Sequence, residues 1–140
     1  MSPMKRGRTH ESDRQSLQHS NALDKILSDA DVKYRLAYPT DSYRSGAIPI
    51  PQGQHSVQFQ ATYTENIQQR YDLRLSVRNN VNDRNRRPEI VGRDWLRFVR
   101  EKHLKSGDRI ILTKEVDEAN AVRYSIRAQT RLFGQWITIP

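Results

Sequence analysis

The residue types most able to recognise a ligand are crowded into residues 78–87 (RNNVNDRNRR). This stretch contains four arginines and four asparagines, namely Arg78, Arg84, Arg86, Arg87, Asn79, Asn80, Asn82 and Asn85. An arginine can donate two hydrogen bonds to guanine, and an asparagine can pair in the same bidentate way with adenine. The stretch has almost nothing to bury and predicts an exposed loop. Its composition alone leaves two interpretations open, a solvated turn and a nucleic-acid contact.

The net charge is concentrated around the same stretch. The chain has 140 residues, with 24 Lys and Arg against 16 Asp and Glu, so its formal net charge is +8. Residues 74–109 hold eleven of the basic and five of the acidic residues, which is three quarters of the excess. A basic balance of this kind favours a polyanionic partner, although a basic solvated face has the same composition.

Several classes of site are excluded or disfavoured. With no cysteine in the chain, disulfide scaffolds, thiolate zinc sites and cysteine nucleophiles are ruled out. The four histidines are far apart, and no paired carboxylates stand out for acid–base chemistry or a metal. Asp29 and Asp31 lie in a turn and are expected to accept from backbone amides. We therefore expect no enzymatic activity, no cofactor and no metal. No apolar run approaches the roughly 18 residues of a membrane helix, so no membrane partner is expected.

The chain is expected to divide at residue 22. Hydrophobic residues make up only 35% of it, below the roughly 45–50% of a typical globular domain. Residues 1–22 are polar and are predicted to be a disordered basic arm. The folded domain is predicted to span residues 23–140.

Within that domain, alternating hydrophobicity predicts mainly β-structure. Short strands are expected at residues 26–27 and 34–38, with turn residues between them and a Pro-rich loop with one helical turn at 40–53. Period-two patterns over residues 57–63 and 71–77 predict a hairpin. Further strands are expected at 88–91, 109–114 and 122–128, with Val122 facing inward. Residues 132–139 form a closing apolar segment.

One helix is predicted over residues 94–105. Asp94 is expected to be its N-cap, and Gly107 its left-handed C-terminal residue. Trp95 and Phe98 fall at helical spacing and are expected in the core. Trp136 is expected in the core or as a lid over one end. Several short strands with one clear helix predict a mostly-β barrel or sandwich.

Two blocks of the chain resemble the plant B3 DNA-binding domain. Residues 25–39 (KILSDADVKYRLAYP) have its lysine, short apolar step, Ser-Asp turn and apolar strand ending in proline. Residues 92–108 (GRDWLRFVREKHLKSGD) have its glycine and tryptophan, Phe-Val pair, Leu-Lys step and Gly-Asp before a strand. The resemblance covers residues 23–131. The chain departs from it in the two residues between Gly92 and Trp95, and in a longer connection after Val77. The Leu-Phe-Gly-Gln-Trp run from Leu132 resembles a divergent B3 subgroup.

The resemblance implies a seven-stranded open β-barrel, the B3 pseudobarrel, with one or two short helices. It implies sequence-specific binding of double-stranded DNA in the major groove through two arms, as a nuclear transcription regulator. The first arm would be residues 28–35, and the second residues 77–88. The DNA-binding residues it implies are Lys25, Ser28, Lys33, Arg35, Arg78, Asn79, Asn80, Asn82, Arg84, Asn85, Arg86 and Arg87.

Roles within the arms follow from their positions. Arg78, Asn79 and Asn80 continue directly from a strand and are expected nearest the base edges. Arg84, Arg86 and Arg87 are equally suited to phosphates, which position a protein without reading sequence. Tyr34 is expected in the core or as a stacking wall. Other transcription factors are a further candidate partner. The alternative function is a B3-like protein–protein interaction module that has lost DNA binding.

Overall fold

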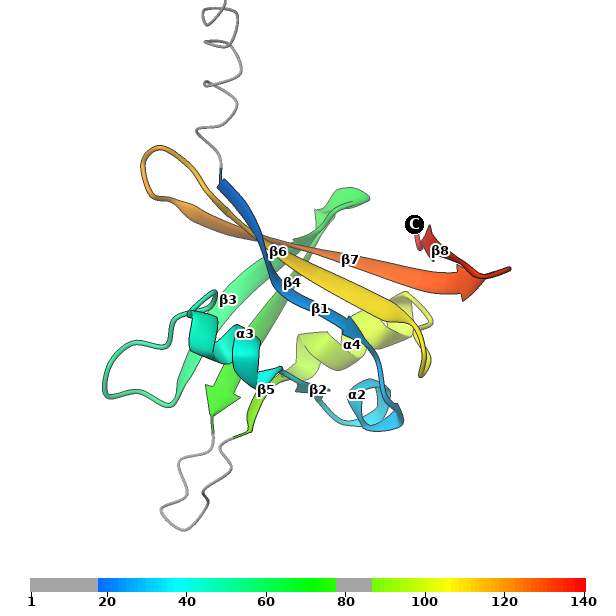
Figure 1. Cartoon of the computed structure of the whole chain (residues 1–140), viewed down its shortest axis with the longest axis horizontal. Helices are drawn as coiled ribbons and strands as arrows, with labels where there is room; N and C mark the ends of the chain where they lie inside the picture. The colour runs from blue at the N-terminus through cyan, green and yellow to red at the C-terminus, as the bar shows by residue number, and fades with distance from the viewer. Residues whose placement is uncertain (1–17, 78–86) are drawn as a thin grey trace, which may run out of the picture.

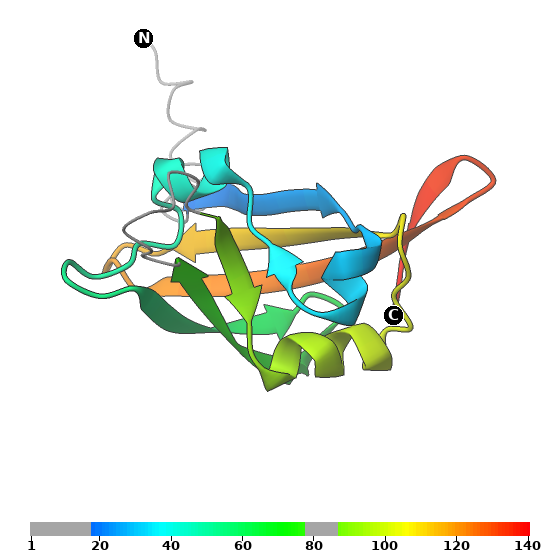
Figure 2. The same cartoon turned by 90° about the horizontal axis from the view of Figure 1, so that it is seen from below.

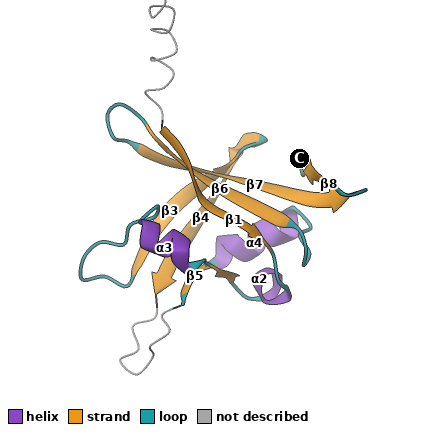
Figure 3. Cartoon of the chain, in the orientation of Figure 1, coloured by secondary structure: helices purple, strands orange, loops and turns teal. Residues whose placement is uncertain are grey.

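The computed structural model describes residues 18–77 and 87–140, which form a mostly-β fold with three short helices (Figure 1, Figure 3). The strands are β1 (Gln18–Ile26), β2 (Leu36–Ala37), β3 (Ser56–Tyr63), β4 (Asn66–Val77), β5 (Pro88–Val91), β6 (Arg109–Val116), β7 (Val122–Leu132) and β8 (Gln135–Thr138). The helices are α2 (Asp29–Lys33), α3 (Thr40–Ser45) and α4 (Arg93–Glu101). Seven strands follow the order β1-β6-β7-β3-β4-β5-β2, and β8 pairs with β7. The sheet curls into an open half-barrel, which confirms the predicted fold class.

The β3–β4 hairpin shows how the alternating pattern builds this sheet. Phe59 lies opposite Leu73, and Ala61 lies opposite Tyr71, so apolar side chains of both strands share the inner face. Polar partners such as Gln60 and Asp72 share the outer face. The predicted hairpin is therefore confirmed, with a two-residue connection between the strands.

Helix α4 packs against β4 (Figure 2) and supplies Trp95, the largest fully buried side chain. Trp95 and Phe98 are fully buried, as predicted. The Phe98 ring meets the Tyr71 ring edge-on at 4.9 Å and the Tyr63 ring at 5.8 Å. Such edge-to-face packing fixes the angle of the helix against the sheet.

The ends of α4 differ from the prediction. The N-cap is Gly92, with no side-chain cap, and Asp94 instead accepts from the backbone N–H of Asp72 at 2.7 Å. At the other end the helix stops at Glu101, because His103 adopts a left-handed conformation with φ 53°.

A Schellman motif closes this C-terminal end. The His103 N–H donates to the Arg100 carbonyl at 3.2 Å, and the Leu104 N–H donates to the Val99 carbonyl at 3.0 Å. Gly107 does have a positive φ of 96°, as predicted, but it does not end α4. Its N–H donates to the Leu27 carbonyl at 2.8 Å, in the turn before β6.

The boundary predicted at residue 22 is also wrong. Strand β1 begins at Gln18 and pairs with β6 from there. Ala22 is completely buried, and its carbonyl accepts from the Tyr38 hydroxyl at 2.8 Å. Residues 18–22 thus belong to the folded domain, and the rest of the predicted arm, residues 1–17, lies outside the described residues.

Three smaller predictions need correction. The strand expected at residues 34–38 is reduced to two residues, and Tyr34 is 71% exposed, which excludes the core and leaves the stacking wall as its predicted role. Val122 starts β7 but is exposed, because it lies beyond the region that the core covers. Trp136 is half-buried on β8 and is not part of the core, so only its predicted role as a lid remains.

Candidate nucleic-acid interface

The connection between β1 and β2, the expected first arm, contains helix α2 and is held by a capping box. The Ser28 hydroxyl accepts from the backbone N–H of Asp31 at 3.2 Å. The Asp31 carboxylate accepts from the backbone N–H of Ser28 at 2.8 Å. This reciprocal pair satisfies two amide groups that a helix start leaves without partners. It also confirms that Asp31 accepts from a backbone amide, as its place near the turn predicted.

Asp31 also joins this connection to three other elements. Its buried carboxylate accepts from the Lys25 ammonium of β1 at 3.0–3.1 Å and from the Ala37 N–H of β2 at 2.9 Å. Its backbone carbonyl accepts from the indole N–H of Trp95 in α4 at 2.8 Å. One residue therefore fixes the first arm to the barrel wall and to the core helix.

The electrostatics of Asp31 match this geometry. Burial raises the pKa of a carboxyl group, because it penalises the charged form. The amide hydrogen bonds from Ser28 and Ala37, together with the Lys25 ammonium, outweigh that effect and lower the pKa of Asp31 below its usual 3.8. The folded protein thus holds Asp31 charged at neutral pH.

Two predicted contact residues are engaged inside the protein. The Lys25 ammonium bridges the Asp31 carboxylate and the Ala37 carbonyl, the latter at 2.9 Å. The Ser28 hydroxyl is the helix cap. Both side chains therefore position the first arm.

Lys33 and Tyr34 near the end of the first arm are exposed, as is Asp29 near its start. Next to them, the Arg35 Nε donates to the Glu89 carboxylate of β5 at 2.7 Å. That ion pair ties the end of the first arm to the strand that leads out of the second.

The second arm leaves the sheet between β4 and β5, where Val77 pairs with Pro88. The Pro88 carbonyl also accepts from the Tyr38 N–H at 2.9 Å, which joins this point to the end of β2. The predicted base-reading and phosphate residues Arg78, Asn79, Asn80, Asn82, Arg84, Asn85 and Arg86 lie outside the described residues. Arg87 is described and exposed.

A hollow of about 330 Å³ lies where the second arm leaves the sheet. Its lining comes from β1, from the segment between β2 and α3, and from the start of β5: Lys25, Ala37, Tyr38, Pro39, Thr40, Arg87 and Pro88. The structure thus brings Lys25 and Arg87, two of the predicted site residues, to one surface although they lie 62 positions apart in the sequence.

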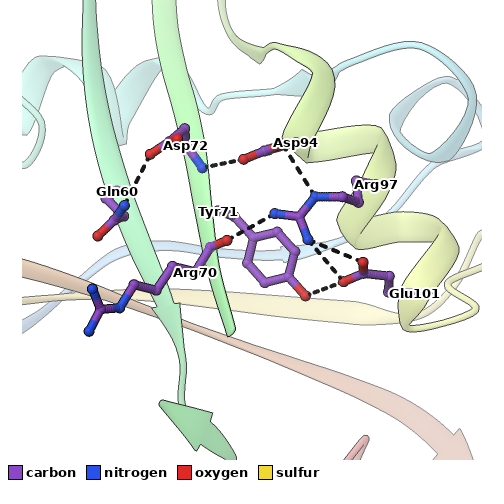
Figure 4. A network of polar contacts seen from close by, with 7 residues as sticks. All are labelled: Gln60, Arg70, Tyr71, Asp72, Asp94, Arg97 and Glu101. Atoms are coloured by element: carbon purple, nitrogen blue, oxygen red, sulfur yellow. Dashed lines mark hydrogen bonds and ion pairs between the residues drawn. The ribbon is translucent and has the colours of Figure 1, made fainter. Parts of the chain in front are cut away.

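A polar network holds α4, and with it Trp95, against β4 (Figure 4). The Arg97 guanidinium donates to the Glu101 carboxylate at 3.1 Å and to the Arg70 carbonyl at 2.9 Å. The Tyr71 hydroxyl donates to Glu101 at 2.7 Å. That hydrogen bond lowers the pKa of Glu101, with Arg97 acting in the same direction, while burial raises the pKa of Tyr71.

No family model matches the chain, and no curated protein matches it in sequence. Solved structures do match. An Arabidopsis FUS3–DNA complex superposes with a TM-score of 0.64 at 16% identity, over 78% of this chain and 96% of that one. The Arabidopsis thaliana transcription factor LEC2–DNA complex gives 0.59 at 18% identity, over 76% and 92%. The chain has the B3 fold.

The B3 fold confirms the resemblance in the two sequence blocks at the level of architecture. Among the residues that the structure describes, no helix is long and apolar enough to cross a membrane, and no group of three or more His, Asp or Glu side chains could hold a metal ion.

The sequence did not predict the ion pair between Arg35 and Glu89, nor the set of residues that lines the hollow. Glu89 lies 54 positions from Arg35, and neither residue type signals such a pairing. Thr40 enters the hollow only because β2 and β5 pair. The sequence feature that could have indicated a surface here is Pro39, the proline that follows β2.

Proposed function

We propose that this B3-fold chain binds double-stranded DNA sequence-specifically in the major groove and acts as a transcription regulator in the nucleus. The observation that carries the proposal is the match of its fold to two structures that are DNA complexes. The concentration of positive charge in residues 74–109 supports it independently, because phosphate neutralisation supplies much of the affinity for DNA.

The roles of the residues follow from the geometry around the arms. Lys33, Arg35 and Arg87 would contact phosphates, because the first and third are exposed and Glu89 holds Arg35 at the end of the first arm. Arg78, Asn79 and Asn80 would read base edges, and the remaining polar residues of the second arm would supply further base or phosphate contacts. These are Asn82, Arg84, Asn85 and Arg86.

Selection of bound sites from random duplex DNA tests this proposal. We expect one enriched motif, bound about a thousandfold or more tightly than a scrambled duplex at moderate salt. Enrichment of no motif, together with no affinity for any duplex at low salt, would instead favour the protein-interaction module.

Substitutions in the second arm should separate reading from positioning. Arg78→Ala and Asn80→Ala are expected to relax preference at particular base pairs, each by about 1–3 kcal/mol of discrimination. The reason is that both follow directly from β4, whose pairing with β3 and β5 holds the backbone before them. Binding of each variant to a panel of single-base-pair changes measures this effect.

Arg84→Ala and Arg87→Ala are the matched controls. They should weaken all duplexes similarly and lower the slope of log affinity against log salt by about one unit for each lost phosphate contact. Uniform weakening by Arg78→Ala, with a changed preference in Arg84→Ala, would reverse the assigned roles.

A further inference from the structure

The β7–β8 hairpin is a second exposed surface, far from the arms. Both views show it projecting from the sheet at the opposite end from the strand ends where β4 stops and β5 begins (Figure 1, Figure 2). Its apolar side chains are left in solvent: Phe133 at the turn is 95% exposed, and Leu132 and Ile137 are about half exposed. A cluster of exposed apolar residues on a soluble fold marks an interaction site.

The outer edge of β8 is free to accept another strand. Within residues 18–77 and 87–140, β8 pairs only with β7. The Ile139 N–H donates to the Ala128 carbonyl of β7. By the alternation of an antiparallel ladder, the backbone groups of Trp136 and Thr138 therefore point away from β7. The four residues of β8 include no charge and no proline, the features by which proteins normally protect such an edge.

The outer face beside this edge is positively charged. Ile126 and Ala128 of β7 are buried, so Arg123, Arg127 and Arg131 share the opposite face of the strand. No carboxylate in the described part of the chain forms an ion pair with Arg127 or Arg131. The structure thus holds uncompensated positive charge next to an open backbone edge.

Trp136 of the edge strand contacts the positively charged side chains of the outer face. It lies opposite Arg131 in the ladder, and its ring is 5.3 Å from the Arg131 guanidinium carbon. The Arg109 guanidinium lies 5.6 Å from the same ring but is already bound to Asp24 at 2.6 and 2.8 Å. Arg131 is therefore the cation of this cluster that remains available to an incoming anion.

We propose that the β8 edge binds an extended segment of a partner protein in which acidic and apolar residues alternate. Its backbone would pair with Trp136 and Thr138, as in strand addition. Its acidic side chains would lie on the outer face, and its apolar side chains beside Ile137 and Leu132. Strands two apart are separated by about 10 Å, a gap that an arginine and a glutamate can span together. A nucleic acid would satisfy neither the open backbone edge nor the apolar face.

Fluorescence anisotropy with the full chain and a labelled peptide of alternating Glu and Val tests the proposal. We expect this peptide to bind at about 0.1 M salt, where the screening length is about 10 Å, and an otherwise identical Lys/Val peptide to fail. Arg131→Glu should weaken the Glu/Val peptide about tenfold, equivalent to about 1.4 kcal/mol, and should allow the Lys/Val peptide to bind. Arg123→Glu makes the same charge change on the same face but eight residues away, and should have an effect below about twofold because salt screens distant charges.

Two further experiments test the backbone pairing. A Glu/Val peptide methylated on alternate amide nitrogens should not bind, since it cannot donate to the edge. Thr138→Pro should abolish binding with the fold intact, because proline is tolerated where a strand N–H faces solvent.

The proposal is overturned if the Glu/Val peptide does not bind the unmodified chain, or if the methylated peptide binds equally well. It is also overturned if Arg123→Glu costs as much as Arg131→Glu, or if Arg131→Glu weakens duplex DNA binding instead. Failure of the DNA-binding proposal would appear separately, as no enriched motif with peptide binding intact.

Discussion

Trp95→Ala is expected to lower the free energy of unfolding by about 3–5 kcal/mol. The Trp95 side chain is completely buried against Phe98, so truncation leaves a large cavity. It also removes the indole N–H that donates to the Asp31 carbonyl, which leaves a buried acceptor without its partner. Chemical denaturation monitored by circular dichroism measures the change.

Two control variants separate these effects. Trp136→Ala, on the half-buried β8 ring, should cost about 1 kcal/mol, because that ring lies outside the core. Trp95→Phe keeps most of the volume but not the hydrogen bond, and should be destabilised less than Trp95→Ala. Its DNA affinity should change only through the position of the first arm. If the Trp95→Phe variant is stable but no longer binds any duplex, the indole itself touches DNA.

Asp31→Ala is expected to cost about 3–5 kcal/mol at neutral pH, the range for removing one partner of a buried ion pair. The variant leaves the Lys25 ammonium without its carboxylate and removes the acceptor of the Ser28 and Ala37 amides. The cost should depend on pH. The folded state lowers the pKa of Asp31, so its contribution is present above the ordinary value of 3.8 and is lost as the pH falls through the lower folded pKa.

The measurement is the difference in unfolding free energy between the unmodified chain and the variant, from neutral pH downward. That difference should shrink below pH about 4. Asp29→Ala is the matched control, because Asp29 lies in the first turn of the same helix but is exposed. It should cost about 0.3–1 kcal/mol, the contribution of an acidic residue to a helix start. Equal costs for the two variants at neutral pH would contradict the central role given to Asp31.

Hydrophobic periodicity in the sequence predicted those strands and helices that turn one face to the core. Alternation in residues 57–77 predicted the β3–β4 hairpin because one face of each strand meets the core. The spacing of Trp95 and Phe98 predicted α4 for the same reason. The end of α4 was mispredicted because His103 and not a glycine adopts the left-handed conformation that ends the helix.

The contacts that position the candidate site were largely beyond prediction, because they join distant residues. Arg35 pairs with Glu89 across 54 positions, and Trp95 donates to the Asp31 carbonyl across 64. Lys25 was expected to contact DNA, whereas the fold places the Asp31 carboxylate 3.0 Å from its ammonium group. Charge patterns predict that a basic surface exists, but tertiary pairing decides which cations remain available.

Mapping of amide chemical shifts in the full chain, titrated with its selected duplex, tests most directly that the two arms form the DNA-binding face. The amides of Lys33, Tyr34, Thr40 and Arg87 should shift together, because they lie on the first arm and around the hollow where the second arm leaves the sheet. The amides of the β7–β8 hairpin should remain unchanged. Shifts centred on that hairpin, with none at Lys33 or Arg87, would contradict a DNA-binding face formed by the two arms.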